Sequence, residues 1–260
     1  MPGCASNRHV EMRHMIQAAK PTSGDFFKSL LASQANESDR TRLSDARQFA
    51  IDAYGEEKRP SGETYLEHGR NVAMALSELG IEDIDTIIAA LLHDTLQPYT
   101  GITVQGLEKR FGREVATLVK GAKTIDDYSK RASRNRILTG IDLDSNLDKD
   151  TLEAIRKALL IIIEGDIRII VIRMVDCLQD LRRVGSLSAS MQHEVAFEAM
   201  NIYAPLANRL GIWHLKSQLE DTAFRYLEPE RYREIARHLD AKQEIRAIKV
   251  NRAADRLRKK

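Results

Sequence analysis

The sequence contains little of what turn-rich, strand-rich or disulfide-stabilised proteins need. Only 14 of its 260 residues are glycine and 6 are proline, and aromatic residues make up 5% of the chain. These low contents argue against collagen-like, low-complexity and strand-rich sandwich folds. Two cysteines, Cys4 and Cys177, are too few to suggest a disulfide framework. We therefore expect a reducing compartment and predict a cytoplasmic protein.

Long hydrophobic runs are also missing. The first twenty residues carry charges and lack the apolar run of a signal peptide. The longest apolar stretch, residues 158–175, is interrupted by four charged residues, so we expect no membrane span. The net charge is only +2, but residues 231–260 hold eleven Lys and Arg against four Asp and Glu. A basic tail of this kind can contact RNA or the ribosome, although a solvated helix face is the simpler interpretation.

What the sequence does contain is helical periodicity. Good helix formers are abundant, and no stretch alternates polar and apolar residues as a half-buried strand would. We predict an all-α fold with one domain. The expected helices cover residues 46–54, 64–79, 83–94, 103–121 (two short helices separated at Gly112), 151–164, 166–184, 190–203, 215–226 and 229–259. A bend is expected at Pro205, and residues 126–150 are expected to form a charged helix and then a loop.

Four potential metal ligands fall in three of these helices: His68, the pair His93–Asp94, and Asp176. Asp94 follows a strongly apolar helix at its C-terminal end, where the helix dipole disfavours a carboxylate. Asp176 lies within an apolar helix, and burying a lone carboxylate is costly. A divalent cation would relieve both, and this ligand set suits Mn, Fe, Co, Ni or Zn better than Mg or Ca. An isolated His–Asp pair is more often a capping or hydrogen-bonding pair, so both interpretations stay open.

The segments around these residues resemble the HD phosphohydrolase superfamily, and more narrowly the N-terminal hydrolase domain of RelA/SpoT homologues, the bifunctional enzymes of the alarmone (p)ppGpp. The matching segments are KRPSGETYLEH (58–68), AALLHD (89–94), FGREVA (111–116), DIRIIVIRMVD (166–176), IYAPLANRLGI (202–212) and LEDTAFRYL (219–227). The resemblance covers about residues 43–235. It implies an HD-domain helical bundle of about ten helices.

The resemblance also implies a domain organisation. We expect residues 1–40 to form a polar, partly disordered N-terminus and residues 41–228 to form the HD hydrolase domain. Residues 229–260 are then a basic helix that leads towards a synthetase domain, which this sequence does not contain. In a full-length protein of this kind the synthetase domain would be a partner in cis.

The activity implied by the resemblance is metal-dependent hydrolysis. It removes the 3′-pyrophosphate from guanosine tetra- or pentaphosphate and yields GDP or GTP plus pyrophosphate. Arg59 matches the family's basic residue beside the nucleotide base, and Ser61 lies in the same loop. One Mn²⁺ ion per chain would lower the pKa of a bound water and neutralise phosphate charge. Its expected ligands are His68, His93, Asp94 and Asp176.

Two departures from the family pattern bear on catalysis. Family hydrolases usually carry a Glu–Asp pair where this chain has Gln97–Pro98, and that pair is thought to position or deprotonate the attacking water. A glutamine amide can bind a water but cannot accept its proton, and general-base catalysis is typically worth about 10²–10⁴-fold. Asp180 replaces an expected nucleotide-facing asparagine. It can act as a substitute base or nucleotide contact, or simply form an ion pair with Arg173 or Arg183.

Two hypotheses follow. The first is a (p)ppGpp 3′-pyrophosphohydrolase domain impaired by the loss of the acidic pair, with Gln97 and Asp180 as the catalytic candidates. The alternative is a catalytically degenerate HD domain that binds metal or nucleotide and regulates an adjacent synthetase domain. A phosphohydrolase for another nucleotide is less favoured, because the similarity extends well beyond the ligands. Glu164 and Asp166 could offer carboxylates, but a helix break with a capping aspartate is the preferred interpretation.

Overall fold

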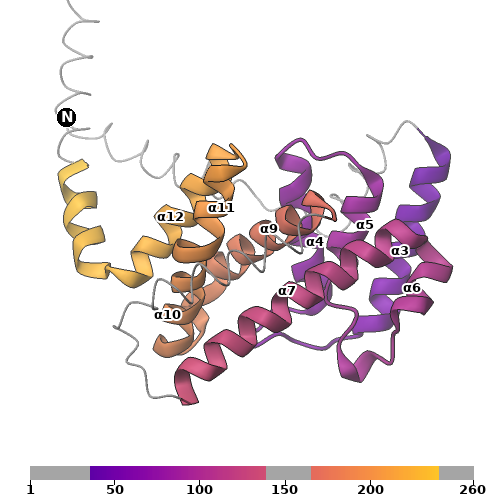
Figure 1. Cartoon of the computed structure of the whole chain (residues 1–260), viewed down its shortest axis with the longest axis horizontal. Coiled ribbons are helices and arrows are strands. Elements are labelled where there is room, and N and C mark those ends of the chain that lie inside the picture. The colour runs from indigo at the N-terminus through magenta and orange to yellow at the C-terminus, as the bar shows by residue number, and fades with distance from the viewer. Residues whose placement is uncertain (1–35, 139–164, 240–260) are drawn as a thin grey trace, which may run out of the picture.

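The structure is a computed structural model that describes residues 36–138 and 165–239, without the side chains of residues 128–138. Within these residues it is helical and contains no β-strand (Figure 1), which confirms the predicted all-α fold. The helices are α3 (Glu37–Tyr54), α4 (Tyr65–Glu78), α5 (Ile84–Leu92), α6 (Val104–Phe111), α7 (Arg113–Leu138), α9 (Ile167–Arg183), α10 (Ala189–Glu198), α11 (Ala204–Arg209) and α12 (Trp213–Leu227). Short turns η1 (Pro98–Thr100), η2 (Val184–Ser186) and the π-helical η3 (Ala199–Tyr203) connect them, and residues 229–239 are helical too.

Helices α4, α5 and α9 begin where the sequence predicts, because each has a capping side chain. The Thr64 hydroxyl accepts from the Glu67 amide in a capping box, and Asp83 accepts from the Thr86 amide. Asp166 accepts from the Arg168 amide, which confirms the capping interpretation of that aspartate.

Three boundaries differ from the prediction. Helix α3 starts at Glu37, capped by Asn36, so helical structure begins inside the segment expected to be a polar terminus. Helix α7 runs without a break from Arg113 to Leu138, so it joins the helix expected to end at residue 121 to the charged helix expected after residue 126. Residues 189–209 are helical throughout, and Pro205 follows the π-helical turn η3 at the start of α11 instead of bending the chain out of the helix. The helix expected at 151–164, including Glu164, and the end of the basic tail lie outside the described residues.

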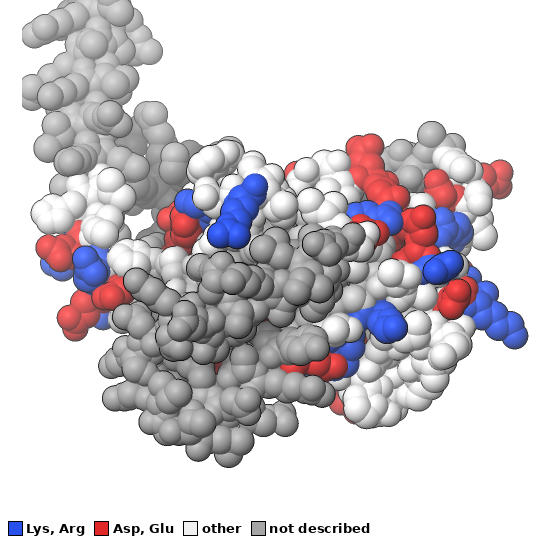
Figure 2. All heavy atoms as spheres, in the orientation of Figure 1, with Lys and Arg blue, Asp and Glu red and all other residues white. Residues whose placement is uncertain are grey.

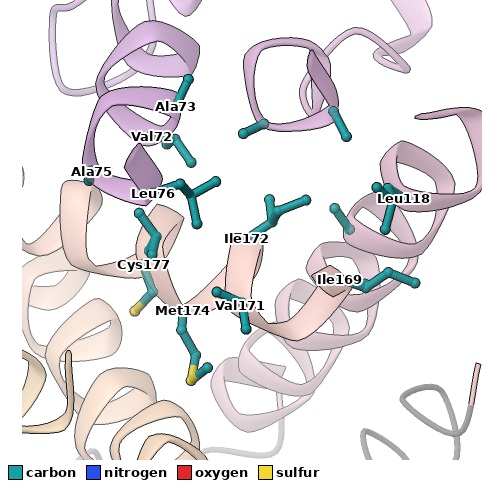
Figure 3. Close-up of a cluster of buried hydrophobic side chains, with 14 of the residues drawn as sticks. Val72, Ala73, Ala75, Leu76, Leu118, Ile169, Val171, Ile172, Met174 and Cys177 are labelled. Atoms are coloured by element: carbon teal, nitrogen blue, oxygen red, sulfur yellow. The ribbon is translucent and has the colours of Figure 1, made fainter. Parts of the chain in front are cut away.

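Helix α9 lies at the centre of the fold. It contacts α4, α5 and α7 on one side and α10, α12 and η3 on the other (Figure 1). Figure 3 shows apolar side chains of α4, α7 and α9 meeting around Leu76, Leu118 and Ile172, which are all fully buried. Helix α5 is also buried from Thr86 to Leu92. Polar residues on α9 or at the end of α5 are therefore held inside the protein.

Helices α4 and α5 approach each other at Gly69. A Cβ atom built at this position would lie 2.5 Å from the backbone oxygen of Leu91, closer than real Cβ contacts allow. Only glycine permits this approach. The contact brings His68, the neighbour of Gly69, close to the end of α5.

The surface carries both signs of charge. Figure 2 shows acidic and basic side chains interspersed over the described part of this face, in keeping with a net charge of only +2. Among the described helices, none has the length and apolar character required to cross a membrane.

Candidate metal centre

The four predicted ligands meet at one point inside the protein. His68 lies in the first turn of α4, His93 and Asp94 follow α5 directly, and Asp176 lies in the middle of α9. The ligand atoms of His68, His93 and Asp94 lie within 4.8 Å of one another. Asp176 Oδ1 lies 2.6 Å from His68 Nε2 and 3.5 Å from His93 Nε2. All four side chains belong to buried residues, so none of them points into solvent.

One atom of this cluster is left without a hydrogen-bond partner, and this is the main evidence that the site fits a metal. His93 Nδ1 lies 2.7 Å from the backbone oxygen of Ala90. A carbonyl oxygen only accepts, so Nδ1 carries a hydrogen, and in the neutral form of the ring Nε2 presents a lone pair to the cluster. His93 Nε2 is buried and has no hydrogen-bond partner. An orphaned buried acceptor is costly, whereas an imidazole lone pair facing two carboxylates is a good metal ligand.

The two carboxylate oxygens of Asp176 have different partners. Oδ1 faces the two imidazoles, and Oδ2 accepts a hydrogen bond from Arg173 on the preceding turn of α9. Burial alone would raise the pKa of this carboxyl, but Arg173 and His93 outweigh burial and hold it well below its usual range. The pKa of Asp94 is also lowered against the effect of burial, by His93 and Arg59. Both carboxylates are therefore ionised at neutral pH.

His68 bridges two carboxylates. Its Nε2 faces Asp176, and its Nδ1 lies 3.2 Å from Glu63 Oε1. Burial and the nearby Arg59 charge disfavour its protonation, but the hydrogen bonds to Asp176 and Glu63 prevail and raise the pKa to about 9. Without a metal ion, the imidazolium form of His68 compensates the acidic cluster.

Arg59 and Asp180, two of the three predicted nucleotide contacts, lie together at the edge of this cluster; the third is Ser61. Arg59 Nη1 lies 3.2 Å from Asp94 Oδ2, and Arg59 Nη2 lies 3.0 Å from Asp180 Oδ1. Asp180 thus faces the same site as Asp176, as its helical spacing predicts. The ion pairs expected for Asp180 were wrong, because Arg173 pairs with Asp176 and Arg183 pairs with Glu63.

The remaining predicted residues are close but contact the site differently. Gln97 Nε2 lies 3.4 Å from Asp94 Oδ1, so its amide donates to a predicted ligand. Ser61 Oγ lies 3.5 Å from Glu63 Oε1, and the Ser61 backbone oxygen accepts from Ser186 Oγ at 3.1 Å. Gln97 therefore contacts a predicted ligand directly, whereas Ser61 contacts Glu63, which in turn contacts His68.

Sequence reasoning assigned no role to Glu63, and it treated Arg173 only as a possible partner of Asp180. Glu63 is only 4% exposed and accepts from His68 and from Arg183, whose Nε lies 2.7 Å away. Arg173 is buried and lies 3.5 Å from the Tyr203 hydroxyl as well as bonding Asp176. The three-residue spacing of Arg173 and Asp176 on one helix face could have indicated their pairing. No comparable local signal marks Glu63.

Comparison with known proteins agrees with this geometry. The HD domain family matches residues 46–213. The guanosine-3′,5′-bis(diphosphate) 3′-pyrophosphohydrolase of Aquifex aeolicus is 40% identical over 190 residues, which are 73% of this chain and 24% of that protein. The bifunctional (p)ppGpp synthase/hydrolase SpoT of Escherichia coli K12 is 36% identical over 211 residues, which are 81% of this chain and 27% of that protein.

A third relative, the probable guanosine-3′,5′-bis(diphosphate) 3′-pyrophosphohydrolase of Synechocystis, is 35% identical over 210 residues, 81% of this chain and 25% of its own length. The chain thus spans about a quarter of the length of these curated relatives. The resemblance to a RelA/SpoT-type HD domain, expected from the motifs, is confirmed. With more than half of its residues matched by the family, the chain belongs to the HD domain family.

Proposed function

We propose that this chain is a (p)ppGpp 3′-pyrophosphohydrolase domain that binds one Mn²⁺ ion through His68, His93, Asp94 and Asp176. The observation that carries the proposal is the convergence of these side chains on a buried point towards which His93 Nε2 presents an unpartnered lone pair. The names of the matched relatives supply the substrate class.

When bound, the ion would supply a water of lowered pKa and neutralise phosphate charge. The protein residues prepare the site. Arg173 holds one oxygen of Asp176 and leaves the other facing the imidazoles. Asp94 accepts from Arg59 and from Gln97, so both of these side chains are placed beside a ligand.

Arg59 is the residue best placed to bind the anionic substrate. Its guanidinium spans Asp94 and Asp180, and its side chain is 16% exposed at the edge of the cluster. Phosphate oxygens make charge-assisted hydrogen bonds with guanidinium groups and compete for the same donors as these carboxylates. We expect substrate to take over part of the Arg59 contacts.

Asp180 is our candidate proton acceptor, because Gln97 cannot accept a proton. Burial raises the pKa of Asp180 even though Arg59 opposes this change. A carboxylate of raised pKa is a better base than an ordinary one. Since Asp180 is paired with Arg59, we expect turnover to be slower than in an enzyme with the Glu–Asp pair.

The regulatory alternative, a degenerate HD domain that controls an adjacent synthetase, is not favoured by the relatives, because several are named as hydrolases. A synthetase domain in cis remains our prediction for a longer protein, since one matched relative is named a bifunctional synthase/hydrolase. The boundaries at residues 41 and 228, a cytoplasmic location, and the basic helix as a connection to that domain also remain predictions.

The decisive experiment measures pyrophosphate release from ppGpp with Mn²⁺ and with EDTA. We expect slow, Mn²⁺-dependent release that Asp176→Ala abolishes. The Asp45→Ala variant is the matched control, because Asp45 pairs with Arg110 on the surface and does not belong to the cluster. The absence of pyrophosphate at high protein and Mn²⁺ concentrations would refute the proposed activity.

A further inference from the structure

Among the described residues, Glu63 is a buried carboxylate that lies beside the cluster and has no part in the proposed hydrolysis. It ends the loop before α4, five residues ahead of His68, and is 4% exposed. Its Oε1 lies 3.2 Å from His68 Nδ1, and its Oε2 lies 2.7 Å from Arg183 Nε. The Asn71 amide is a further donor at 3.5 Å from Oε2. Both oxygens are therefore occupied by donors.

The contact with His68 determines which ring nitrogen is free. Both ring nitrogens of His68 face carboxylates, and an ionised carboxylate only accepts hydrogen bonds, so both nitrogens carry hydrogens in the metal-free imidazolium. When a cation takes the place of the Nε2 hydrogen, the Glu63 carboxylate keeps the hydrogen on Nδ1 and leaves the Nε2 lone pair facing the centre of the cluster. The backbone oxygen of Ala90 imposes the same tautomer on His93. Each of the two imidazoles is thus oriented by an acceptor on its far side.

We propose that Glu63 is a positioning residue that holds His68 in the tautomer and orientation required to bind the metal ion. This inference rests on the proposed metal site and names a residue that acts through one of its ligands. Acceptors behind ligating histidines fix the ring and increase its basicity, and their removal typically weakens metal binding about 10–100-fold.

A direct metal-binding role for Glu63 fits the geometry less well. Oxygens of Glu63 and Asp180 and a nitrogen of His68 do lie within 4.8 Å of one another. However, each oxygen of Glu63 already accepts from a donor, Oε1 from His68 and Oε2 from Arg183, so neither oxygen is free to bind a cation. The same contacts suit a carboxylate that has to stay in place behind His68.

Arg183 also anchors the loop that carries Glu63. It lies at the end of α9, and Ser186 in the following turn donates to the backbone oxygen of Ser61 at 3.1 Å. The loop before α4 is therefore attached to the helix that carries Asp176. This attachment couples the position of Glu63 to the position of a second ligand.

The test compares Glu63→Gln with Glu57→Gln by titrating Mn²⁺ into the EDTA-treated, dialysed protein in a calorimeter. Glu57 is an exposed residue of the same loop, so its variant loses the same charge from the surface and not from a buried contact with His68. A glutamine at position 63 cannot accept from both His68 and Arg183 with its single oxygen. We expect a 10–100-fold higher Kd for Mn²⁺ in Glu63→Gln and an unchanged Kd in Glu57→Gln.

Two further measurements separate positioning from a merely structural role. Excess Mn²⁺ should restore pyrophosphate release by Glu63→Gln, because the proposal has Glu63 act on the ligand His68 and not on the substrate. If Glu63→Gln does not fold, Glu63→Asp replaces it. This variant keeps the negative charge beside Arg183 but shortens the side chain that reaches His68, so its Kd for Mn²⁺ should also rise. Equal Mn²⁺ affinity in the folded position-63 variant and wild type would overturn the inference. A wild-type chain that binds no Mn²⁺ would overturn the proposed metal site itself.

Discussion

Replacing Gly69 with alanine should push α5 away from α4. The added Cβ would lie 2.5 Å from the Leu91 backbone oxygen, about 0.9 Å inside the shortest ordinary van der Waals contact of 3.4 Å. Backbone atoms cannot rotate out of the way as a flexible side chain can. The Tyr54 hydroxyl donates to the same Leu91 oxygen at 3.3 Å, so a shift of α5 disturbs this hydrogen bond as well.

The expected cost combines two opposing effects. Overpacking a well-packed interior costs about 1–3 kcal/mol. Alanine recovers up to about 1 kcal/mol through its higher helix propensity. We therefore expect Gly69→Ala to lower the free energy of unfolding by about 1–2 kcal/mol. Because Gly69 neighbours His68 and Leu91 precedes His93 by two residues, Mn²⁺ affinity should fall too.

Urea unfolding at 25 °C in EDTA measures the stability change, and Gly106→Ala provides the control. Gly106 is also helical, but its added Cβ would meet only the Thr103 hydroxyl at 3.4 Å, so stability should stay constant or rise. If Gly69→Ala is as stable as Gly106→Ala and binds Mn²⁺ as tightly as wild type, the close approach of α4 and α5 does not position the ligands.

Three other predictions follow from the site. Arg173→Met leaves the buried Asp176 carboxylate without its main counter-charge and should reduce the free energy of unfolding by about 3–5 kcal/mol in urea, whereas a loss below 1 kcal/mol would contradict the buried ion pair. The double variant Gln97→Glu, Pro98→Asp should increase the rate of pyrophosphate release by about 10²–10⁴-fold, and an unchanged rate would show that general-base loss does not limit turnover. In EDTA, protonation of His68 stabilises the folded protein, because its pKa is raised from the ordinary value of 6.5 to about 9. This stabilisation is fully present below pH 6.5 and is lost as the pH rises through about 9. The free energy of unfolding should thus fall by about 3 kcal/mol over this range, and His68→Gln should lack this part of the decrease.

The positions of the four candidate ligands at helix ends and within a helix were predictable from the sequence, because local features determine where these helices begin and end. Thr64 and Asp83 mark the starts of α4 and α5, so His68 falls in the first turn of α4. His93 directly follows the last residue of α5. Asp94 and Asp176 stood out because carboxylates are unusual beside strongly apolar helical segments. These features depend on residues close in sequence, and the structure reproduces them.

The partners of those ligands were not predictable in the same way. The Arg59–Asp180 pair joins residues 121 positions apart, and Glu63 is held by Arg183 at the far end of α9. Such contacts depend on how α4 packs against α9. Helical spacing correctly placed Asp180 on the face of Asp176, but helical spacing cannot identify a partner that comes from a loop.

The most direct test of this account is the stoichiometry of Mn²⁺ binding to the metal-free chain, measured by isothermal titration calorimetry. The account predicts one ion per wild-type chain and a large loss of affinity when His93, whose Nε2 has no partner within the cluster, is replaced by alanine. A wild-type chain that binds no Mn²⁺, or a His93→Ala variant that binds it as tightly as wild type, would contradict it.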